Sequence, residues 1–443
     1  MSLIKKTFKT IDELKKHLKT HAPTFYYSSQ TSTVIPYDKI ADFFKNKEMT
    51  LGDLSQLPCS MELTPTQNLI VKGAISWKDA KDFLRSKKRN IMTSPTEELA
   101  LISAGAATSA TGERCFHFGN LRSQIISLTY LNFDGNEVKL NQDIALKNTS
   151  NEVKKYQKDY AQYDIFKNAP FPRLETQTDL MIGTEGQLGI ITEIEIKTTD
   201  DFPVNHLFIL LPKWEVDSKA HLEIINKVQK FRNMVILCEL IDANSFEYLP
   251  KADRPNKEMD AIFFEIKTQS FNDFYEQFVL NLEYIDQDHV FELAATKFHN
   301  IRASIPRAVF EKNSQMGVVK KGTDVQVSVS QFETLLKIYQ NFTKLGIKYN
   351  LFGHFGDAHL HFNFMPLPNQ VELCHEQLEL LYGHVLKLNA SPFAEHGIGI
   401  IKQKYIPAFW NQNTFKVFKQ LKDEHDPYKQ FFPQGFMSLE DHS

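Results

Sequence analysis

The stretch TDLMIGTEGQLGIITEIEIKTT, residues Thr178–Thr199, joins a glycine-rich turn to a β-branched run. Gly183, Gly186 and Gly189 reach positive φ without strain, so main-chain N–H groups in such a turn can approach a flat or anionic ligand. From Ile190 to Lys197, isoleucine and threonine alternate with other residues, which predicts a strand that is apolar on parts of both faces. The glycine spacing alone is equally typical of an ordinary β-turn before a strand.

The complete string is more specific than its glycine spacing. It resembles the signature G-[ST]-E-G-x-L-G-[IV]-[IV]-T of FAD-linked oxidases of the vanillyl-alcohol-oxidase type, a group that includes D-lactate, glycolate and D-2-hydroxyglutarate dehydrogenases. The resemblance implies an α+β fold, with a PCMH-type FAD-binding domain of two subdomains and a cap domain in which helices cover an antiparallel sheet. It also implies FAD contacts for Glu185, Gly186, Gly189, Ile190 and Ile191.

Composition narrows the class of protein. A chain of 443 residues is long enough for two or three domains, and its net charge of −3 gives no overall field that would attract nucleic acid, so we expect no nucleic-acid partner. The four cysteines have no paired spacing, which favours a reducing compartment over a disulfide framework. No targeting segment or transmembrane run is evident. We therefore expect a cytoplasmic protein, at most peripheral to a membrane.

The residue pattern changes near residue 200, where strand-like and helix-like runs begin to alternate. The expected strands are His206–Leu211, Met234–Ile241 and Asp260–Lys267, and the expected helices are Lys219–Arg232, Asn272–Asp286 and Val371–Leu388. We predict an FAD-binding domain at 1–200 and a cap domain at 201–390. The resemblance implies that residues 391–443 return to the FAD-binding domain.

Near the N-terminus, the resembled family has a glycine-rich loop for the FAD pyrophosphate. This chain has hydroxyl and amide side chains there instead, which can still donate hydrogen bonds to phosphate oxygens. The predicted contacts are Ser28, Ser29, Gln30, Thr31 and Ser32. No histidine lies between His21 and His117 to tether the flavin, so non-covalent FAD is expected.

A second run of small residues extends from Ser103 to Gly112. Small side chains let the backbone lie against a dinucleotide, although a tight turn packed on a core has the same composition. The predicted cofactor contacts are Gly105, Thr108, Thr111, Gly112 and Gly119. Within this run, Ala110–Glu113 also resembles alkylglycerone-phosphate synthase, a relative that uses FAD without net redox chemistry.

Alternation in the segment LFGHFGDAHLHFNFMP, Leu351–Pro366, predicts a strand that carries His359, His361 and Asn363 on one face. With His354 and Asp357 on the preceding turn, the histidines form a candidate divalent-metal cluster. Clustered histidines are also found on polar sheet faces that bind nothing, so this segment alone leaves both interpretations open.

A later segment, AEHGIG at 394–399, resembles the E-H-G-[IV]-G segment of metal-dependent D-2-hydroxy-acid dehydrogenases, and GHFGDAHLH resembles their G-H-x-G-D-G-N-x-H. The resemblance implies that His354, His361 and Glu395 are metal ligands and that His396 is the catalytic base. His359 replaces the family's asparagine, which implies a substituted substrate contact. Imidazole and carboxylate ligands suit zinc, the ion that we expect, with iron and manganese as alternatives.

A substrate carboxylate needs a cation. By resemblance, Arg302 is the predicted substrate arginine, which can form two parallel hydrogen bonds, and Lys321 is a second candidate near a shifted K-x-D motif. On sequence position alone, Arg302 fits a surface ion pair as well.

These residues predict an FAD-dependent dehydrogenase that oxidises a small D-2-hydroxy acid to the 2-oxo acid. In this reaction flavin N5 takes the Cα hydride, and a metal and a histidine remove the hydroxyl proton. The electron acceptor is expected to be a quinone, a cytochrome or an electron-transfer flavoprotein. The alternatives are a non-redox enzyme of the alkylglycerone-phosphate-synthase kind, and a degenerate FAD-binding scaffold without turnover.

Overall fold

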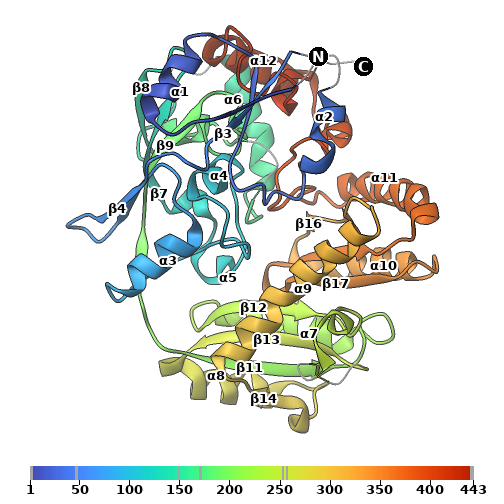
Figure 1. The fold of residues 1–443 in the computed structure, drawn as a ribbon. Helices are drawn as coiled ribbons and strands as arrows, with labels where there is room; N and C mark the ends of the chain where they lie inside the picture. The colour runs from blue at the N-terminus through green and yellow to red at the C-terminus, as the bar shows by residue number, and fades with distance from the viewer. Residues whose placement is uncertain are drawn as a thin grey trace.

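Four β-sheets organise the part of the chain that the computed structural model describes, which is residues 3–44, 48–147, 150–168, 172–251, 254–255 and 258–439. Figure 1 shows two lobes, with the chain up to about residue 200 and the red C-terminal segment in the upper lobe and the yellow-green, yellow and orange segments in the lower one. The architecture mixes helices with largely antiparallel sheets, which is the expected α+β class.

The upper lobe is built on two sheets, and a further two-stranded antiparallel sheet pairs β6 (Arg89–Ile91) with β10 (Thr198–Asp200). A parallel sheet has the order β1-β3-β2, and an antiparallel sheet has the order β4-β5-β9-β7-β8. Their strands are β1 (Ile4–Thr7), β2 (Thr24–Tyr27), β3 (Thr50–Asp53), β4 (Ser60–Leu63), β5 (Leu69–Lys72), β7 (Ile125–Leu131), β8 (Glu137–Asn141) and β9 (Ile190–Ile196). The strand predicted after the glycine-rich turn is therefore the central strand of the larger sheet.

Helices pack on these sheets and bring distant segments into one core. The helices are α1 (Ile11–Leu18), α3 (Trp77–Arg85), α4 (Ile102–Ala107), α5 (Cys115–Phe118), α6 (Asn151–Tyr160) and α12 (Gln412–His425). Buried residues from the end of the chain, Phe393, Trp410, Phe418 and Phe436, belong to the same hydrophobic cluster as Trp77 and Ile194. The C-terminal segment thus contributes directly to the core of the upper lobe.

The lower lobe is built on an eight-stranded sheet with the order β14-β11-β13-β12-β17-β18-β15, in which β16 also pairs with β18. The strands are β11 (Val204–Leu211), β12 (Val235–Ile241), β13 (Asp260–Lys267), β14 (Val290–Glu292), β15 (Lys321–Gly322), β16 (Val325–Gln326), β17 (Tyr349–His354) and β18 (His359–Phe364). One face packs against α7 (Lys219–Val228), α8 (Phe271–Gln277), α10 (Phe332–Thr343) and α11 (Val371–Lys387). The other face packs against α9 (Ala295–Gln315), the long helix that crosses Figure 1 diagonally.

The predicted elements of this lobe match closely with one exception. Strands β13 and β18 have the predicted bounds, whereas the helix predicted over Asn272–Asp286 is wrong in its second half, because α8 ends at Gln277. There Phe278 stacks on Phe274 with ring centroids 4.7 Å apart, and Asn281 Nδ2 donates to the carbonyl oxygen of Glu276. A side chain that satisfies the terminal carbonyls ends a helix.

Among the described residues, no helix combines the length and the apolar run that a membrane span requires.

Candidate active site

The signature turn, Gly183–Gly189, is held against helix α4. The backbone N–H of Glu185 donates to Ala107 O at 2.8 Å, and that of Gly183 donates to Ala106 O at 3.3 Å. Gly186 has φ = +71°, and a Cβ added to it would meet no protein atom closer than 3.9 Å. Gly189 differs, because its added Cβ would lie 2.4 Å from Tyr130 Cδ2. Gly186 therefore leaves space free, whereas Gly189 lets two strands pack.

A cavity opens beside this turn, here called the flavin cavity. It is bounded by strand β2, the hydroxyl-rich loop after it, helix α4, the signature turn and Gly399. The predicted cofactor residues that line it are Ser28, Ser32, Thr108, Glu185, Gly186, Gly189, Ile190 and Ile191. The cavity is also lined by Tyr26, Tyr27 and Tyr37, which were not among the predicted contacts.

The other predicted cofactor contacts do not line the flavin cavity: Ser29, Gln30, Thr31, Gly105, Thr111, Gly112 and Gly119. Two of these glycines pack against protein, because an added Cβ on Gly105 would lie 2.9 Å from Trp77 and one on Gly112 would lie 2.7 Å from Ser94 O. Gly119 accepts a hydrogen bond from Thr93 Oγ1 through its carbonyl oxygen. The packed-turn interpretation of this run therefore applies to Gly105 and Gly112.

Glu185 joins the signature turn to the E-H-G segment. Its carboxylate accepts hydrogen bonds from the backbone N–H groups of Ile398 at 2.6 Å and Gly399 at 2.9 Å. Burial raises the pKa of Glu185 to about 7, although these two donors oppose the shift.

Three histidines and Glu395 converge at the other end of the E-H-G segment, and His354, His359, His361 and Glu395 are here called the His–Glu cluster. Antiparallel pairing of β17 with β18 places His354 opposite His359, and β-strand alternation brings His361 to the same face. His354 Nε2 lies 2.8 Å from Glu395 Oε2, and His361 Nε2 lies 3.0 Å from Glu395 Oε1. The three predicted metal ligands are thus within reach of one ion.

The cluster fits a divalent ion in its chemistry. The second ring nitrogen of each predicted ligand histidine is held from outside, since His354 Nδ1 lies 2.7 Å from Glu239 Oε1 and His361 Nδ1 lies 3.1 Å from Thr323 O. Such partners fix the ring and the tautomer of a ligating histidine. Burial would raise the pKa of Glu395, but His354 and Lys167 hold it well below its usual value, so the carboxylate is ionised.

His396 lies against the cluster, with its ring stacked on that of His361 at a centroid distance of 4.8 Å. His396 Nε2 is 3.4 Å from Glu395 Oε1, and Nδ1 is 3.6 Å from Asp324 Oδ2. Burial lowers the pKa of His396 to about 4 even though Asp324 opposes the shift, so the imidazole is neutral near pH 7.

Asp324, which is not among the predicted site residues, organises this side of the site. It accepts hydrogen bonds from the backbone N–H groups of Glu395 and His396 and from Lys402 Nζ, and His359 Nε2 lies 3.1 Å from its Oδ1. Burial would raise the pKa of Asp324, but His396 and Lys402 hold it well below its usual value. Asp324 is the aspartate of the shifted K-x-D motif, and that position could have singled it out from the sequence.

Arg302 is buried on α9 and already paired. Its guanidinium lies 3.1 Å from Glu113 Oε1 and 3.6 Å from Glu239 Oε1, the oxygen that also faces His354. Acidic and basic side chains therefore alternate from Glu113 through Arg302, Glu239 and His354 to Glu395. Glu239 is the one acid of the apolar strand VILCELI, and this exception could have singled it out from the sequence as a site residue.

The structure does not bring Lys321 to the cluster. Lys321 Nζ lies 2.5 Å from His375 Nε2 on α11, whereas its neighbour Lys320 is influenced by the charges of Asp324 and Glu395. Burial lowers the pKa of Lys320 to about 8, with Asp324 opposing the shift. A Cβ added to Gly322 would lie 2.4 Å from Asn363 Oδ1 and 3.2 Å from Lys320 Cε, so the missing side chain leaves room for both Asn363 and Lys320.

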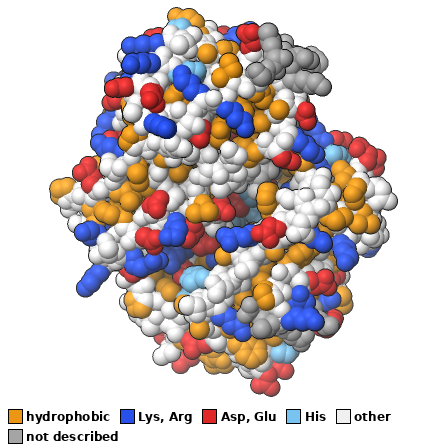
Figure 2. All heavy atoms as spheres, in the orientation of Figure 1, with side chains coloured by type: hydrophobic (Ala, Val, Ile, Leu, Met, Phe, Trp, Pro, Cys, Tyr) orange, Lys and Arg blue, Asp and Glu red, His pale blue; other side chains and the backbone are white. Residues whose placement is uncertain are grey.

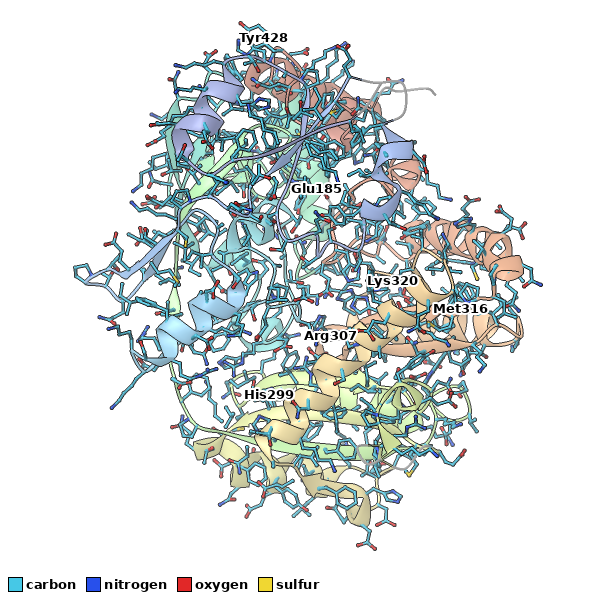
Figure 3. The ribbon with its side chains drawn as sticks, in the orientation of Figure 1. Glu185, His299, Arg307, Met316, Lys320 and Tyr428 are labelled. Atoms are coloured by element: carbon cyan, nitrogen blue, oxygen red, sulfur yellow. The ribbon has the colours of Figure 1, made fainter. Side chains whose placement is uncertain are left out.

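Lys320 lies at the boundary between the lobes, between α9 and the upper lobe that carries Glu185 (Figure 3). Acidic, basic and histidine side chains gather along this boundary on the face shown in Figure 2. Lys320 forms no ion pair within 4.0 Å among the described residues, so its charge faces the site unpaired.

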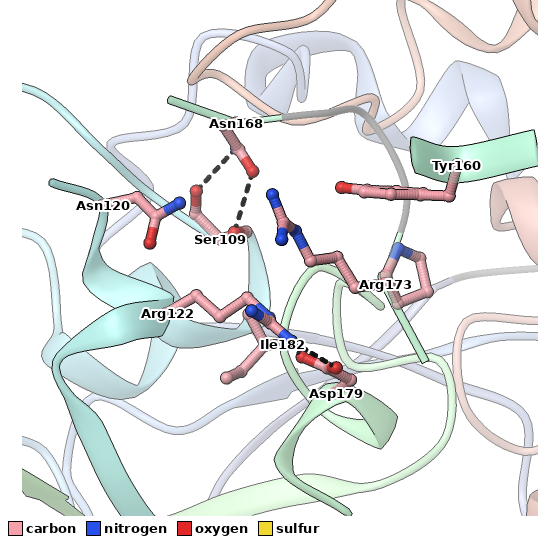
Figure 4. Close-up of a pocket in the computed structure, with 9 residues that line it drawn as sticks. Ser109, Asn120, Arg122, Tyr160, Asn168, Arg173, Asp179 and Ile182 are labelled. Carbon is pink, nitrogen blue, oxygen red and sulfur yellow. Dashed lines mark hydrogen bonds and ion pairs between the residues drawn. The ribbon is translucent and has the colours of Figure 1, made fainter. Parts of the chain in front are cut away.

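Lys167 approaches the cluster from the upper lobe, with Nζ 3.5 Å from Glu395 Oε2. Its loop is fixed on several sides, because Lys167 N–H donates to Gln326 Oε1 and the Asn168 side chain bonds twice to Ser109. Figure 4 shows these Asn168 bonds at the rim of a small polar pocket. Both arginines of the pocket form ion pairs with acids, Arg122 with Asp179 and Arg173 with Asp164. The pocket therefore stabilises the loop.

A second group of possible ligands, His206, Glu265 and His299, lies in the lower lobe. Arg114 forms two hydrogen bonds with the Glu265 carboxylate, at 3.0 and 2.8 Å. A cation there would have to displace the arginine, so this group does not fit a metal as the His–Glu cluster does.

Comparisons with known proteins agree with this architecture. Residues 292–434 match the family described as FAD linked oxidases, C-terminal domain. The chain is 21% identical over 391 residues to a mitochondrial D-lactate dehydrogenase [cytochrome] of Kluyveromyces lactis, which covers 84% of this chain and 62% of that protein. It is 22% identical over 367 residues to a D-2-hydroxyglutarate dehydrogenase of Xanthomonas citri pv. viticola, which covers 74% of this chain and 66% of that protein.

The chain thus spans about three fifths to two thirds of the length of these relatives. Among solved structures, an alkyldihydroxyacetonephosphate synthase superposes with a TM-score of 0.68 at 13% identity, covering 97% of this chain and 77% of that chain. At this identity the likeness shows the fold alone, and it confirms the predicted fold.

Proposed function

We propose that this chain, which belongs to the FAD-linked oxidase superfamily, is a flavin-dependent dehydrogenase that oxidises a D-2-hydroxy acid to the 2-oxo acid. One observation carries the proposal. The E-H-G segment joins the flavin cavity, which Gly399 lines, to the His–Glu cluster, which contains Glu395. A flavin site and a metal-ligand set next to a neutral histidine suit the removal of a hydride from Cα of the substrate and of a proton from the hydroxyl group on that carbon.

The residues that would hold FAD are those that line the flavin cavity, where Ser28, Ser32 and Thr108 supply hydroxyl groups and Gly186 leaves open space. His354, His361 and Glu395 would hold the ion, which we take to be zinc. Bound FAD would supply the hydride acceptor, and a bound divalent ion would lower the pKa of the substrate hydroxyl.

His396 is the proposed base, and Nε2 is the atom that receives the proton. Its side chain is 21% exposed, against 5% for His361 and 6% for His354, so it is the most accessible histidine of the group. When Nε2 gains a proton, Asp324 beside Nδ1 stabilises the imidazolium. Asp324 therefore positions the ring and favours proton transfer to it.

Lys320 is the proposed partner of the substrate carboxylate, in place of the predicted Lys321. Arg302 remains a candidate, but Glu113 and Glu239 already bind it, so it would contribute by fixing Glu239 and thereby His354. For the electrons, we propose a cytochrome, a quinone or an electron-transfer flavoprotein as acceptor, and the name of the Kluyveromyces lactis relative indicates a cytochrome for that protein.

The test is an anaerobic titration of the purified protein with D- and L-2-hydroxy acids, followed at the flavin absorbance band with metal content assayed in parallel. The proposal expects bleaching by one D-acid, and loss of bleaching after chelation of the metal. A flavin that stays oxidised with every acid would favour the non-redox alternative, whose fold this chain shares. A colourless protein that takes up no added FAD would identify an empty scaffold.

A further inference from the structure

We propose that His359 is a third imidazole ligand of the metal, so that three histidines and one glutamate hold the ion. This inference rests on the proposed function, because it takes His354, His361 and Glu395 to bind a divalent ion. It differs from the predicted role of His359 as a substrate contact.

The first argument is that all three rings have the same arrangement. In each, one nitrogen faces an acceptor outside the cluster and the other faces Glu395. For His359, Nε2 lies 3.1 Å from Asp324 Oδ1 and Nδ1 lies 3.9 Å from Glu395 Oε2. Outer acceptors of this kind are typical of metal-ligating histidines, because they fix the tautomer that leaves a lone pair on the inner nitrogen.

The second argument concerns the tautomer of His359. Asp324 accepts from two backbone N–H groups and from Lys402 Nζ, so it is an ionised acceptor and His359 Nε2 must be the atom that carries the hydrogen. Nδ1 of the neutral ring is then an acceptor only. Such an atom cannot donate to an anionic substrate, as the family's asparagine can, but it can bind a cation.

The third argument is burial. The His359 side chain is 0% exposed, and its Nδ1 has no hydrogen-bond partner in the described part of the chain. A buried polar atom without a partner destabilises a fold, so native structures seldom keep one without a reason. A metal ion inside the cluster would give Nδ1 its partner.

The fourth argument is distance. One ligand atom from each of His354, His359, His361 and Glu395 lies within 4.8 Å of all the others. Neighbouring ligand atoms in a tetrahedral site with bonds of about 2.1 Å are about 3.4 Å apart, so small rotations of the side chains suffice. Four protein ligands fill a tetrahedron, and the substrate oxygen would therefore bind as a fifth ligand.

The experiment measures metal binding to the FAD-loaded protein. After chelation, the wild type is reloaded with Zn²⁺, its Kd is determined by competition with a chromogenic chelator, and X-ray absorption counts the coordinated imidazoles. The same measurements are made on His359→Asn, on His359→Gln in case the first variant does not fold, and on the surface control His384→Asn. Glu395→Gln tests the underlying metal site.

We expect three imidazoles in the wild type and in His384→Asn, two in His359→Asn, and a Kd for Zn²⁺ that rises by about 10- to 100-fold in His359→Asn with FAD retained. A count of two in the wild type, with the same Kd in His359→Asn, would overturn the inference and leave the proposed metal site intact. Unchanged metal binding in Glu395→Gln would overturn both. Since the wild-type count needs no variant, the outcome does not depend on how a variant folds.

Discussion

Two buried glutamates, Glu185 and Glu395, show that the flavin cavity and the His–Glu cluster differ in their electrostatics. At the flavin cavity, burial raises the pKa of Glu185 to about 7, although the backbone N–H groups of Ile398 and Gly399 and the charge of Lys402 oppose the shift. At the His–Glu cluster, His354 and Lys167 overcome burial and hold the pKa of Glu395 well below its usual value. The walls of the cavity are therefore mostly uncharged, with glycines, apolar side chains and tyrosines, whereas the cluster depends on fixed charges.

The difference shows which kind of site a sequence specifies more fully. A histidine or glutamate side chain indicates which chemistry it can do, and the resemblance of two motifs singled out His354, His361 and Glu395, which the structure brings together. A glycine indicates only that a side chain is missing, and the space beside it can hold a ligand, as at Gly186, or another part of the protein, as at Gly105.

The largest effect is expected at the cluster, for His396→Ala. Removing a general base costs about 10²- to 10⁴-fold in rate, so flavin reduction by the substrate should fall by that factor while FAD stays bound. Anaerobic stopped-flow absorbance measures the rate, and the 450 nm band measures bound FAD. His384→Ala, on the exposed side of α11, is the control. Reduction at the wild-type rate in His396→Ala would remove this residue from its proposed role.

Glu185→Gln sharpens the contrast between the two glutamates. The folded protein holds the Glu185 proton up to pH about 7 and the unfolded chain only up to about 4.5, the ordinary pKa of a glutamate, so the free energy of unfolding should decline as pH rises from 4.5 to 7 and level off above. The decline amounts to about 3 kcal/mol, and Glu185→Gln should lack it. Denaturant unfolding from pH 4 to 8 measures the difference, with the exposed Glu62→Gln as control. Parallel curves for wild type and Glu185→Gln would contradict the raised pKa.

Lys320→Met and Lys321→Met separate two neighbouring lysines. Only Lys320 carries an unpaired charge towards the cluster, so its substitution should raise KM for the hydroxy acid by about 10- to 100-fold, the range for loss of a charge-assisted hydrogen bond. Lys321→Met should leave KM within about twofold, since Lys321 contacts His375. Steady-state kinetics decides between them, and the reverse pattern would restore the role first predicted for Lys321.

Gly186→Ala and Gly105→Ala give the smallest effects and test the cavity. The methyl group of Gly186→Ala would enter open space, so FAD affinity should fall by about tenfold, with a loss of about 1 kcal/mol in stability from the positive φ. In Gly105→Ala the methyl group would meet Trp77, so stability should fall while the folded protein keeps its FAD affinity. Fluorescence titration and thermal unfolding measure the two quantities. Equal FAD affinities would show that Gly186 does not face the cofactor.

Much of the fold could be predicted because local patterns determine it. Alternation fixed β18 and placed His361 correctly, and buried apolar runs fixed β11, β12 and β13. The choice between Lys320 and Lys321 could not be predicted, because it depends on the two-residue strand β15 and on the space that Gly322 leaves. Nor could the partners of Glu239 or Asp324, since those contacts join residues more than 30 positions apart.

The core of the upper lobe includes Phe393, Trp410, Phe418 and Phe436. During synthesis the upper lobe, although it begins first in the sequence, therefore cannot complete its core until these last residues have been made. All strands of the lower lobe's eight-stranded sheet, in contrast, lie between residues 204 and 364. The usual order of synthesis and folding is thus inverted. Until about 50 further residues follow the lower lobe's last helix, the nascent upper lobe exposes apolar surface, and chaperones would be needed most at that stage.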